Sequence, residues 1–498
     1  MDLRIFDKPL YGFTWGGRDG KVRQHPYKAN FSVTINLQEN PHVLTWARGF
    51  SAGAGPRYLQ IVGFLEQALA DGLLLPGDRL PPQRELAARL GVDLTTVTRA
   101  LNEARRRRLV ESRGTLGTFV AAQTAELAQV VDLSMNVPPP PEGVDFNDVM
   151  RRGLTQVTLR TDASLLMTYQ LGGGSASERA AGAQWLAPML GAVEPSRVVV
   201  YPGAQSALAA LVLAHSAPGD AIAAEPLIYP GMRLAAATLG RRIVTIGVDA
   251  DGMRPDLLEA ACRNEGVRLV YLNPTSQNPT THTMPEARRL ELARIAAAWD
   301  ALIIEDDPYW LLTPDAPPPI AALAPERVAY VSTLSKCLSP GLRTAYVVMP
   351  GGPETQEAML SALRAFSLMA APLSMALAMQ WIQDGSATEL LAGIRAEAAA
   401  RQAIARQWLP GSGALSPAGI HLWHALPSYW SAARFSRAAL DEQLRVTPSD
   451  AFHEGPTPPN MIRISLGGAA QRTQLSMALK RLADLLARKP LDQAAAVV

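Results

Sequence analysis

Beyond about residue 145, short apolar runs rich in β-formers alternate with stretches of helical periodicity. This alternation predicts an α/β fold, with a mostly parallel sheet covered by helices on both faces. Ligands bind such sheets at the carboxyl ends of the strands, so residues that follow the strands are the first candidates for a site. The expected buried strands are 198–201, 221–224, 243–248, 267–272, 301–305, 328–331 and 346–349, and helical patterns such as 205–216 and 286–299 lie between many of them.

Lys336 follows the apolar run 328–331 in a turn rich in serine and threonine. A lysine amine condenses with an aldehyde only if it is held in place and partly neutral, which desolvation and a neighbouring cation favour. Thr333, Ser335 and Arg343 add hydroxyls and a bidentate cation suited to an anionic phosphate. The combination indicates a Schiff-base lysine in a pyridoxal phosphate (PLP) site. A surface lysine after a buried strand would show the same short motif.

Two further strand ends carry candidate groups. Asp306 follows the run 301–305, where its carboxylate could pair with a pyridine N–H and keep the ring an electron sink, and Tyr309 could donate to the ring oxygen O3′. The alternative is an acidic turn. Ala204 and Gln205 open a helix after another strand, and the N–H groups and dipole at such a junction can hold phosphate. An ordinary strand-to-helix turn would have the same pattern.

Three other side chains are weaker candidates. Tyr229 follows a strand and could stack on a flat ring, although tyrosine is also common in cores. Asn278 could donate its amide to a phenolate oxygen, or could simply begin a turn before proline. Arg463 lies within an apolar strand, where a buried guanidinium needs an anion. That anion is either a ligand carboxylate or an internal aspartate.

The amino-terminal region has a different organisation. A helical pattern over 58–69 is followed by a short helix, 83–90, which ends at Gly91, and by a third helix from about 95 through the arginines at 105–108. Two helices around a tight turn that contains glycine form a helix-turn-helix. The runs 109–112 and 117–120 then predict a two-stranded wing.

Charge in this region is one-sided. Residues 84–113 hold eight arginines and four acidic residues, whereas the whole chain is nearly neutral, with 47 Lys+Arg against 45 Asp+Glu. A local basic surface of this kind is typical of phosphate binding, and the polar start of the third helix could reach base edges in a major groove. The alternative is that the arginines at 105–108 only solvate a helix end.

The rest of the chain contains no further candidate site, but it limits the class of protein and its location. Residues 1–43 have no assignable function, residues 122–131 are a linker, and the prolines at 138–141 predict a stiff spacer. Two cysteines, Cys262 and Cys337, provide neither a disulfide framework nor a metal site. The first residues lack the apolar core of a secretory signal, and no apolar run is long enough to cross a bilayer, so a cytoplasmic location is expected.

Residues 57–121 resemble the GntR-type winged helix-turn-helix, through the segments 76–81, 84–87 and 117–120. The resemblance implies that the third helix reads an operator in double-stranded DNA and that the wing touches the backbone. The contacts it implies are Arg84, Thr95, Thr96, Thr98, Arg99 and Arg113.

Residues 132–490 resemble the class I aminotransferase domain of fold type I, which has a smaller carboxy-terminal α/β lobe. The resemblance implies that Lys336 binds PLP as a Schiff base and that Asp306 binds the pyridine nitrogen. It also implies contacts to O3′ from Tyr309 and Asn278, stacking by Tyr229, a carboxylate contact from Arg463, and phosphate contacts from Ala204, Gln205, Thr333, Ser335, Arg343 and, from a neighbouring subunit, Tyr169. Two departures stand out: Thr281 replaces the glycine of Asn-Pro-Thr-Gly, and Ala204 replaces a frequent serine.

Together, the regions 44–121 and 132–490 look like the MocR subfamily of GntR-type regulators. This resemblance implies a PLP-dependent homodimer that binds DNA and senses an amine or amino acid, without a membrane segment or a metal. Two alternatives are open: an active aminotransferase with a secondary DNA-binding domain, and a DNA-binding protein whose large domain is only a dimerisation scaffold.

Overall fold

The computed structural model describes residues 11–14, 23–26, 50, 55–70, 73–74, 77–107, 109–112, 114, 117–121, 130–160, 167–351, 353–411 and 419–489. The chain divides into two compact units, residues 1–128 and 129–498. Most of the expected linker, 122–129, lies outside the described residues, as do Arg108, Arg113 and all of 1–43 except two short paired strands, β1 (Tyr11–Thr14) and β2 (Arg23–Pro26).

The first unit contains the expected helix-turn-helix and wing. Its elements are α1 (Arg57–Ala70), α2 (Gln83–Leu90), α3 (Leu94–Arg106), β3 (Val110–Ser112) and β4 (Thr118–Val120). Gly91 ends α2 with a φ of 64°, a left-handed conformation that glycine adopts without steric cost. Apolar side chains at helical spacing, such as Ile61 and Leu65, pack with Val97 and Leu101 in one core. Val110 and Val120 pair across the wing.

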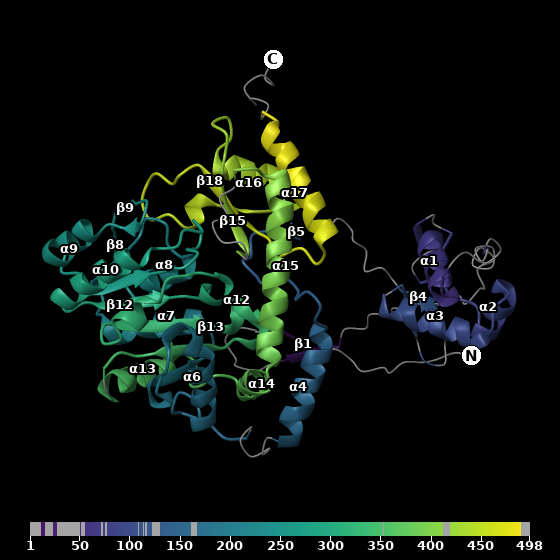
Figure 1. The fold of residues 1–498 in the computed structure, drawn as a ribbon, viewed down its shortest axis with the longest axis horizontal. Coiled ribbons are helices and arrows are strands. Elements are labelled where there is room, and N and C mark those ends of the chain that lie inside the picture. The colour runs from purple at the N-terminus through teal and green to yellow at the C-terminus, as the bar shows by residue number, and fades with distance from the viewer. Residues whose placement is uncertain are drawn as a thin grey trace. The chain divides into compact units, whose positions relative to one another are not determined.

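The second unit is built on a seven-stranded sheet in the order β6-β14-β13-β12-β11-β7-β8 (Figure 1). The strands are β6 (Val198–Tyr201), β7 (Ala221–Ala224), β8 (Arg242–Thr245), β11 (Leu269–Leu272), β12 (Leu302–Asp306), β13 (Val328–Thr333) and β14 (Ala345–Val348). Only β14 runs against its neighbours, β13 and β6. The mostly parallel sheet expected from the alternating pattern is therefore confirmed.

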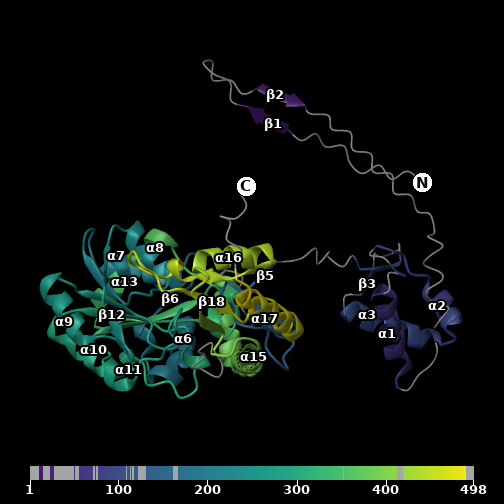
Figure 2. The ribbon, with the colours of Figure 1, turned by 90° about the horizontal axis from the view of Figure 1, so that it is seen from above.

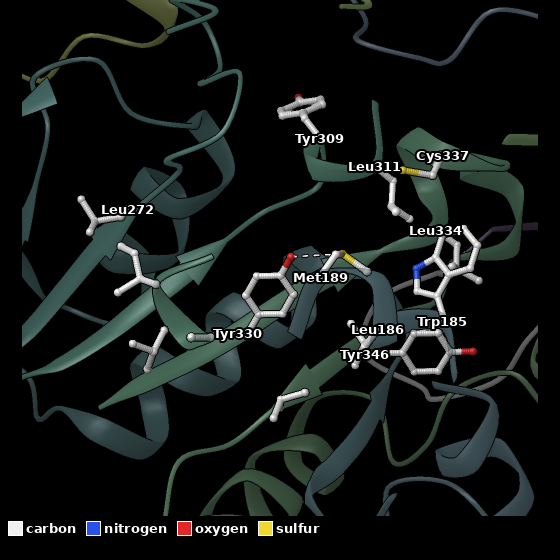
Figure 3. Close-up of a cluster of buried hydrophobic side chains, with 14 of the residues drawn as sticks. Trp185, Leu186, Met189, Leu272, Tyr309, Leu311, Tyr330, Leu334, Cys337 and Tyr346 are labelled. Atoms are coloured by element: carbon white, nitrogen blue, oxygen red, sulfur yellow. Dashed lines mark hydrogen bonds between the residues drawn. The ribbon is translucent and has the colours of Figure 1, made fainter. Parts of the chain in front are cut away.

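Helices cover both faces of this sheet. One face packs against α7 (Ala204–His215), α8 (Pro230–Thr238) and α13 (Pro353–Phe366). The other packs against α6 (Ala176–Leu190), α9 (Pro255–Asn264), α10 (Glu286–Ala298), α11 (Ile320–Leu323) and α14 (Pro372–Gln383). Figure 3 shows part of the second core, where the Tyr330 hydroxyl donates to the Met189 sulfur at 3.2 Å and Tyr309 lies at the border of the cluster. The side chains beneath the strand ends are thus held in fixed positions.

A smaller lobe follows in sequence and includes the start of the unit. Strands β15 (His421–Ala425), β18 (Met461–Ser465) and β17 (Thr447–Pro448) form one sheet, and β5 (Val131–Asp132) pairs with β16 (Leu444–Arg445). The helices α15 (Ser386–Trp408), α16 (Ala432–Asp441) and α17 (Arg472–Ala487) pack around them, and α4 (Phe146–Arg160) packs on α14. Figures 1 and 2 show α16 and α17 on the opposite side of this unit from α9.

Two sequence expectations need correction. The run 243–248 is not one buried strand, because β8 is the edge of the sheet, has a neighbour on one side only, and is followed by a separate short strand, β9 (Val248–Asp249), which pairs with β10 (Gly252–Met253). The proline run 138–141 is not a free spacer. The N–H of Glu142 donates to the Gly393 carbonyl, and a Cβ on Gly467 would lie 1.8 Å from the Val137 carbonyl oxygen, so this stretch is packed onto the body.

Candidate functional site

A cavity of about 540 Å³ lies at the carboxyl ends of the sheet strands. Its size is typical of a small-molecule site. The structure brings together eleven of the twelve residues that the sequence suggested for a cofactor and ligand: Lys336, Asp306, Tyr309, Asn278, Tyr229, Ala204, Gln205, Thr333, Ser335, Arg343 and Arg463. The twelfth, Tyr169, does not line this cavity and is 75% exposed.

Lys336 lies in α12 (Leu334–Cys337), the short helix that begins where β13 ends. Thr333 caps this helix by accepting the N–H of Ser335, which fixes the direction in which the lysine leaves the sheet. Burial, followed by the charge of Arg463, lowers the pKa of Lys336 to about 8. Its Nζ donates to the main-chain carbonyl of Asn136 at 2.5 Å. The amine is thus partly neutral near physiological pH, as a nucleophile must be.

Asp306 lines the cavity at the end of β12. Its Oδ2 accepts the Tyr271 hydroxyl at 2.8 Å, and its carbonyl accepts Nδ2 of Asn273 at 2.5 Å. Burial raises the pKa of the Asp306 carboxyl to about 7, although the bond from Tyr271 opposes this rise. A buried carboxylate has lost the water that stabilised its charge, and a cationic N–H group beside it restores that stabilisation.

Other residues of the cavity lining suit an anion. Ala204 and Gln205 at the start of α7 line the cavity together with Thr333, Ser335 and Arg343. Gly203, which precedes α7, has a φ of 96°, and a Cβ there would lie 2.8 Å from a guanidinium nitrogen of Arg343. Only glycine leaves room for the guanidinium beside the helix start. The N–H groups of the helix start and the charge of Arg343 can therefore bind the same anion.

Arg463 enters the cavity from β18 in the smaller lobe. Its Nη1 donates to Oδ1 of Asn278 at 2.8 Å, its Nη2 donates to the carbonyl of Ser134, and the guanidinium lies 4.9 Å from the Phe452 ring centre. Its Nε is buried and has no hydrogen-bond partner among the described residues. The sequence allowed an internal aspartate as the partner of Arg463, but no aspartate makes a hydrogen bond to it among the described residues. The Nε–H group of the guanidinium therefore still lacks a partner, as a site for an anion requires.

Several residues of the site had no recognisable sequence motif. Asn136 is the most connected of them, since its Nδ2 donates to the Tyr309 hydroxyl at 2.9 Å and lies 3.2 Å from Nδ1 of His421. Tyr271 lies one residue before the end of β11, and Asn273 directly follows the strand. The rule that ligands bind at strand ends could therefore have predicted both as site residues. Asn136 precedes a proline run in the smaller lobe, and no spacing rule connects it with Lys336.

The three threonines expected to contact DNA already have hydrogen-bond partners within the winged helix. Asp93 caps α3, and the hydroxyls of both Thr95 and Thr96 donate to its carboxylate. The Thr98 hydroxyl lies 2.9 Å from both Oε1 of Gln83 and the Leu94 carbonyl oxygen, and its one hydrogen can be donated to either. These threonines hold the start of the recognition helix, so a contact with bases would require their hydroxyls to exchange partners.

The basic residues of this unit also differ among themselves. Arg107 pairs with Glu103 and Glu66, and Arg106 pairs with Glu103. For these two arginines, solvation of the helix end therefore explains the sequence better than a DNA contact does. Arg84 is exposed, and no ion pair involves it within the described ranges. Arg99 is exposed and lies over the Tyr58 ring at 4.6 Å.

The described residues contain neither a candidate metal site nor a candidate membrane span. In that part of the chain, no cluster of three or more histidine, cysteine, aspartate or glutamate residues could hold a metal ion. No helix there has both the length and the apolar character needed to cross a membrane. Cys337 is buried beside Lys336, and burial raises the pKa of its thiol to about 12, which keeps it in the unreactive thiol form.

Comparison with known proteins identifies both units. The family "Aminotransferase class I and II" matches residues 128–482, and "Bacterial regulatory proteins, gntR family" matches residues 57–120. The HTH-type transcriptional regulator YdeF of Bacillus subtilis is 29% identical over 91% of this chain and 99% of its own length. The vitamin B6 salvage pathway transcriptional repressor PtsJ of Salmonella typhimurium is 28% identical over 76% of this chain and 87% of its own. An archaeal alanine:glyoxylate aminotransferase structure superposes with a TM-score of 0.66 and 27% identity, over 72% of this chain and 91% of that one.

The fold and the lysine-bearing cavity define a PLP-dependent transferase domain of fold type I. The chain belongs to the class I and II aminotransferase family and, with its GntR-type winged helix, to the MocR-type transcriptional regulators within the GntR group. It is a DNA-binding regulator, and PLP is the cofactor of its larger domain. The residues present fit that cofactor: a glycine cradle beside Arg343 suits a phosphate, and the buried carboxyl of Asp306 suits a ring N–H.

Proposed function

We propose that the larger domain is a sensor in which PLP, held by Lys336, responds to an amine or amino acid and changes how the winged helices engage an operator. The observation that carries this proposal is the meeting, in one cavity, of a lysine of lowered pKa, a buried carboxyl and an arginine with an unpaired N–H. The protein would work in the cytoplasm, with 44–121 as the DNA-binding domain, 122–131 as the linker and 132–490 as the sensor.

Each side chain has a proposed task. Asp306 would bind the ring nitrogen and Tyr229 would stack on the ring, while Tyr309 and Asn278 would bind O3′. The phosphate would be held by Arg343, Thr333, Ser335, Gln205 and the backbone of Ala204. Bound there, PLP would supply an aldehyde carbon open to amines and a ring that withdraws electrons. Arg463 would orient an incoming amino acid by its carboxylate.

The proposed coupling is a difference in ligand affinity between two conformations. When an amine takes the place of Lys336, the free lysine and the engaged Arg463 would favour another closure of the smaller lobe. Such a ligand can shift DNA binding only if it prefers one conformation over the other. The test is an absorbance titration with candidate amines alongside operator affinity. A changed cofactor band with constant operator affinity would refute the sensor.

A homodimer is part of this proposal. Large apolar or aromatic side chains are exposed here, 75% at Leu159, 86% at Met167 and 75% at Tyr169, and Phe366 and Leu373 are half-exposed. The N–H of Gln170 contacts the Met369 sulfur at 3.2 Å, so the two apolar stretches are side by side. An exposed apolar surface of this kind is typical of an interface. Tyr169, which is outside its own cavity, would then reach the phosphate of the partner subunit.

Turnover as an aminotransferase is a second candidate function. The lowered pKa of Lys336 favours it, because proton transfer during transamination needs a base that is neutral near working pH. Formation of keto acid over repeated cycles, with an added keto acid as acceptor, distinguishes the two functions. A sensor alone would stop after the amine is bound.

A further inference from the structure

The segment 134–136 connects the cavity with the stretch that leads toward the DNA-binding unit. The Asn136 carbonyl accepts Nζ of Lys336 at 2.5 Å, and the Ser134 carbonyl accepts Nη2 of Arg463. We infer that Asn136 is a positioning residue whose main-chain carbonyl holds the Lys336 amine only when that amine is free. The segment 134–136 would then report whether Lys336 is covalently engaged. This inference rests on the proposed covalent attachment of PLP to Lys336.

The chemistry of the lysine nitrogen requires such a change. A free amine has two or three N–H groups to donate. When Nζ forms a C=N bond with the aldehyde carbon of PLP, water leaves and the nitrogen keeps at most one proton, fixed in the plane of the new bond. When an incoming amine forms its own C=N bond to that carbon, Nζ regains its protons and leaves as a free amine. The donor to Asn136 is thus lost on attachment and restored on displacement.

The loss matters because Asn136 is buried, with 6% of its surface exposed. A buried carbonyl without a donor is unfavourable, and water or a shift of the backbone must compensate for it. The Asn136 side chain keeps its own bond to Tyr309, so the change is confined to the main chain at this point. We therefore expect the segment to loosen toward Ser134 and β5 rather than the cavity to collapse.

β5 anchors the start of the unit to the smaller lobe, where the N–H of Ser465 donates to the Leu133 carbonyl at 2.7 Å and the Leu133 side chain is fully buried. Val131 donates to the Gln443 carbonyl and Leu133 donates to the Arg445 carbonyl, each at 2.9 Å, and β5 itself has only two residues. In sequence, the segment 122–130 lies directly between β5 and the wing. A change at Asn136 thus acts on the first anchored residues after the linker.

Hydrogen exchange of the full-length protein tests this inference, with peptides that span 130–137 read by mass spectrometry. The three states are without PLP, with PLP, and with PLP followed by hydroxylamine, which frees Lys336 whatever the natural effector is. Exchange in 130–137 should be fastest with PLP attached, by about fivefold or more, and should slow again after hydroxylamine. Peptides around β13 and α7 should instead gain protection when PLP binds.

Two controls separate a general response from the proposed one. Borohydride reduces the C=N bond and fixes PLP on Lys336 as a secondary amine, so hydroxylamine should no longer change exchange in 130–137. Lys336→Ala has no donor in any state, so its exchange there should be fast and independent of PLP. Equal or slower exchange in the wild type with PLP, while absorbance shows full attachment, would overturn the inference alone. Failure of PLP to attach would overturn the proposed function and the inference together.

Discussion

Arg463 and Asn278 are directly joined, since Nη1 of the arginine donates to Oδ1 of the asparagine at 2.8 Å. One residue comes from β18 of the smaller lobe and the other from the loop after β11, so the proposed carboxylate and O3′ contacts belong to one linked pair. The link requires the Asn278 amide oxygen to face the arginine, which leaves its NH₂ group for the ring oxygen, as the sequence suggested.

Asn278→Asp should therefore weaken carboxylate binding. The new carboxylate would pair with Arg463 and compete with the ligand. We expect the affinity for L-alanine, measured through the cofactor absorbance, to fall about tenfold or more. Ethylamine lacks the carboxylate and serves as the control, with a change of about twofold at most. An equal loss for both amines would show that the substitution damages the ring contact instead.

The rate of PLP attachment should depend on pH through Lys336. Its pKa is lowered to about 8, so the neutral, reactive fraction should rise with pH to a midpoint near 8 rather than near 10.5. Removal of a nearby cation raises a lysine pKa, so Arg463→Gln should move the midpoint upward, whereas Arg445→Gln at the cavity rim should leave it in place. Stopped-flow absorbance measures this dependence. A midpoint unaffected by Arg463→Gln would show that the charge of Arg463 does not lower the pKa of Lys336.

Gly203→Ala should selectively impair binding of the phosphate. The added Cβ would lie 2.8 Å from a nitrogen of Arg343 and displace the guanidinium. We expect the preference for PLP over pyridoxal, which lacks the phosphate, to fall about tenfold or more. Gly219→Ala is the matched control, because Gly219 also has a positive φ, of 91°, yet a Cβ there meets nothing within 4 Å. A similar loss in both variants would indicate backbone strain alone.

The sheet and most of the cavity could be predicted because strand ends converge in a parallel sheet. Asp306 ends β12, Tyr309 follows β12 and Lys336 follows β13, and the alternation of strands and helices suffices to place them together. β8 was misjudged because an edge strand can have the same apolar composition as a central one. Burial depends on neighbours, and the sequence of one strand does not specify them.

Contacts between lobes could not be predicted in the same way. Asn136 and Lys336 are 200 positions apart, and they meet because the start of the unit packs into the smaller lobe. Thr281 shows a different limit: it adopts a φ of 63° where the related motif has glycine, so the turn persists although the residue disfavours it. Local propensity is a weak guide where surrounding structure determines the backbone.

DNA binding should distinguish Arg84 from Arg107, two exposed arginines of the winged helix. Arg107 already pairs with Glu103 and Glu66, whereas Arg84 has no ion pair within the described residues. If Arg84 contacts a phosphate, Arg84→Ala should weaken operator and unrelated duplex about equally and reduce the slope of log K against log salt by about one. Arg107→Ala should leave that slope unchanged and affect the stability of the first unit instead.

Fluorescence anisotropy on labelled duplex at several salt concentrations measures the salt dependence of both variants, and thermal unfolding of each variant shows whether the fold is intact. Equal slopes for Arg84→Ala and the wild type would place the phosphate contact elsewhere on the unit, with the exposed Arg99 the next residue to test.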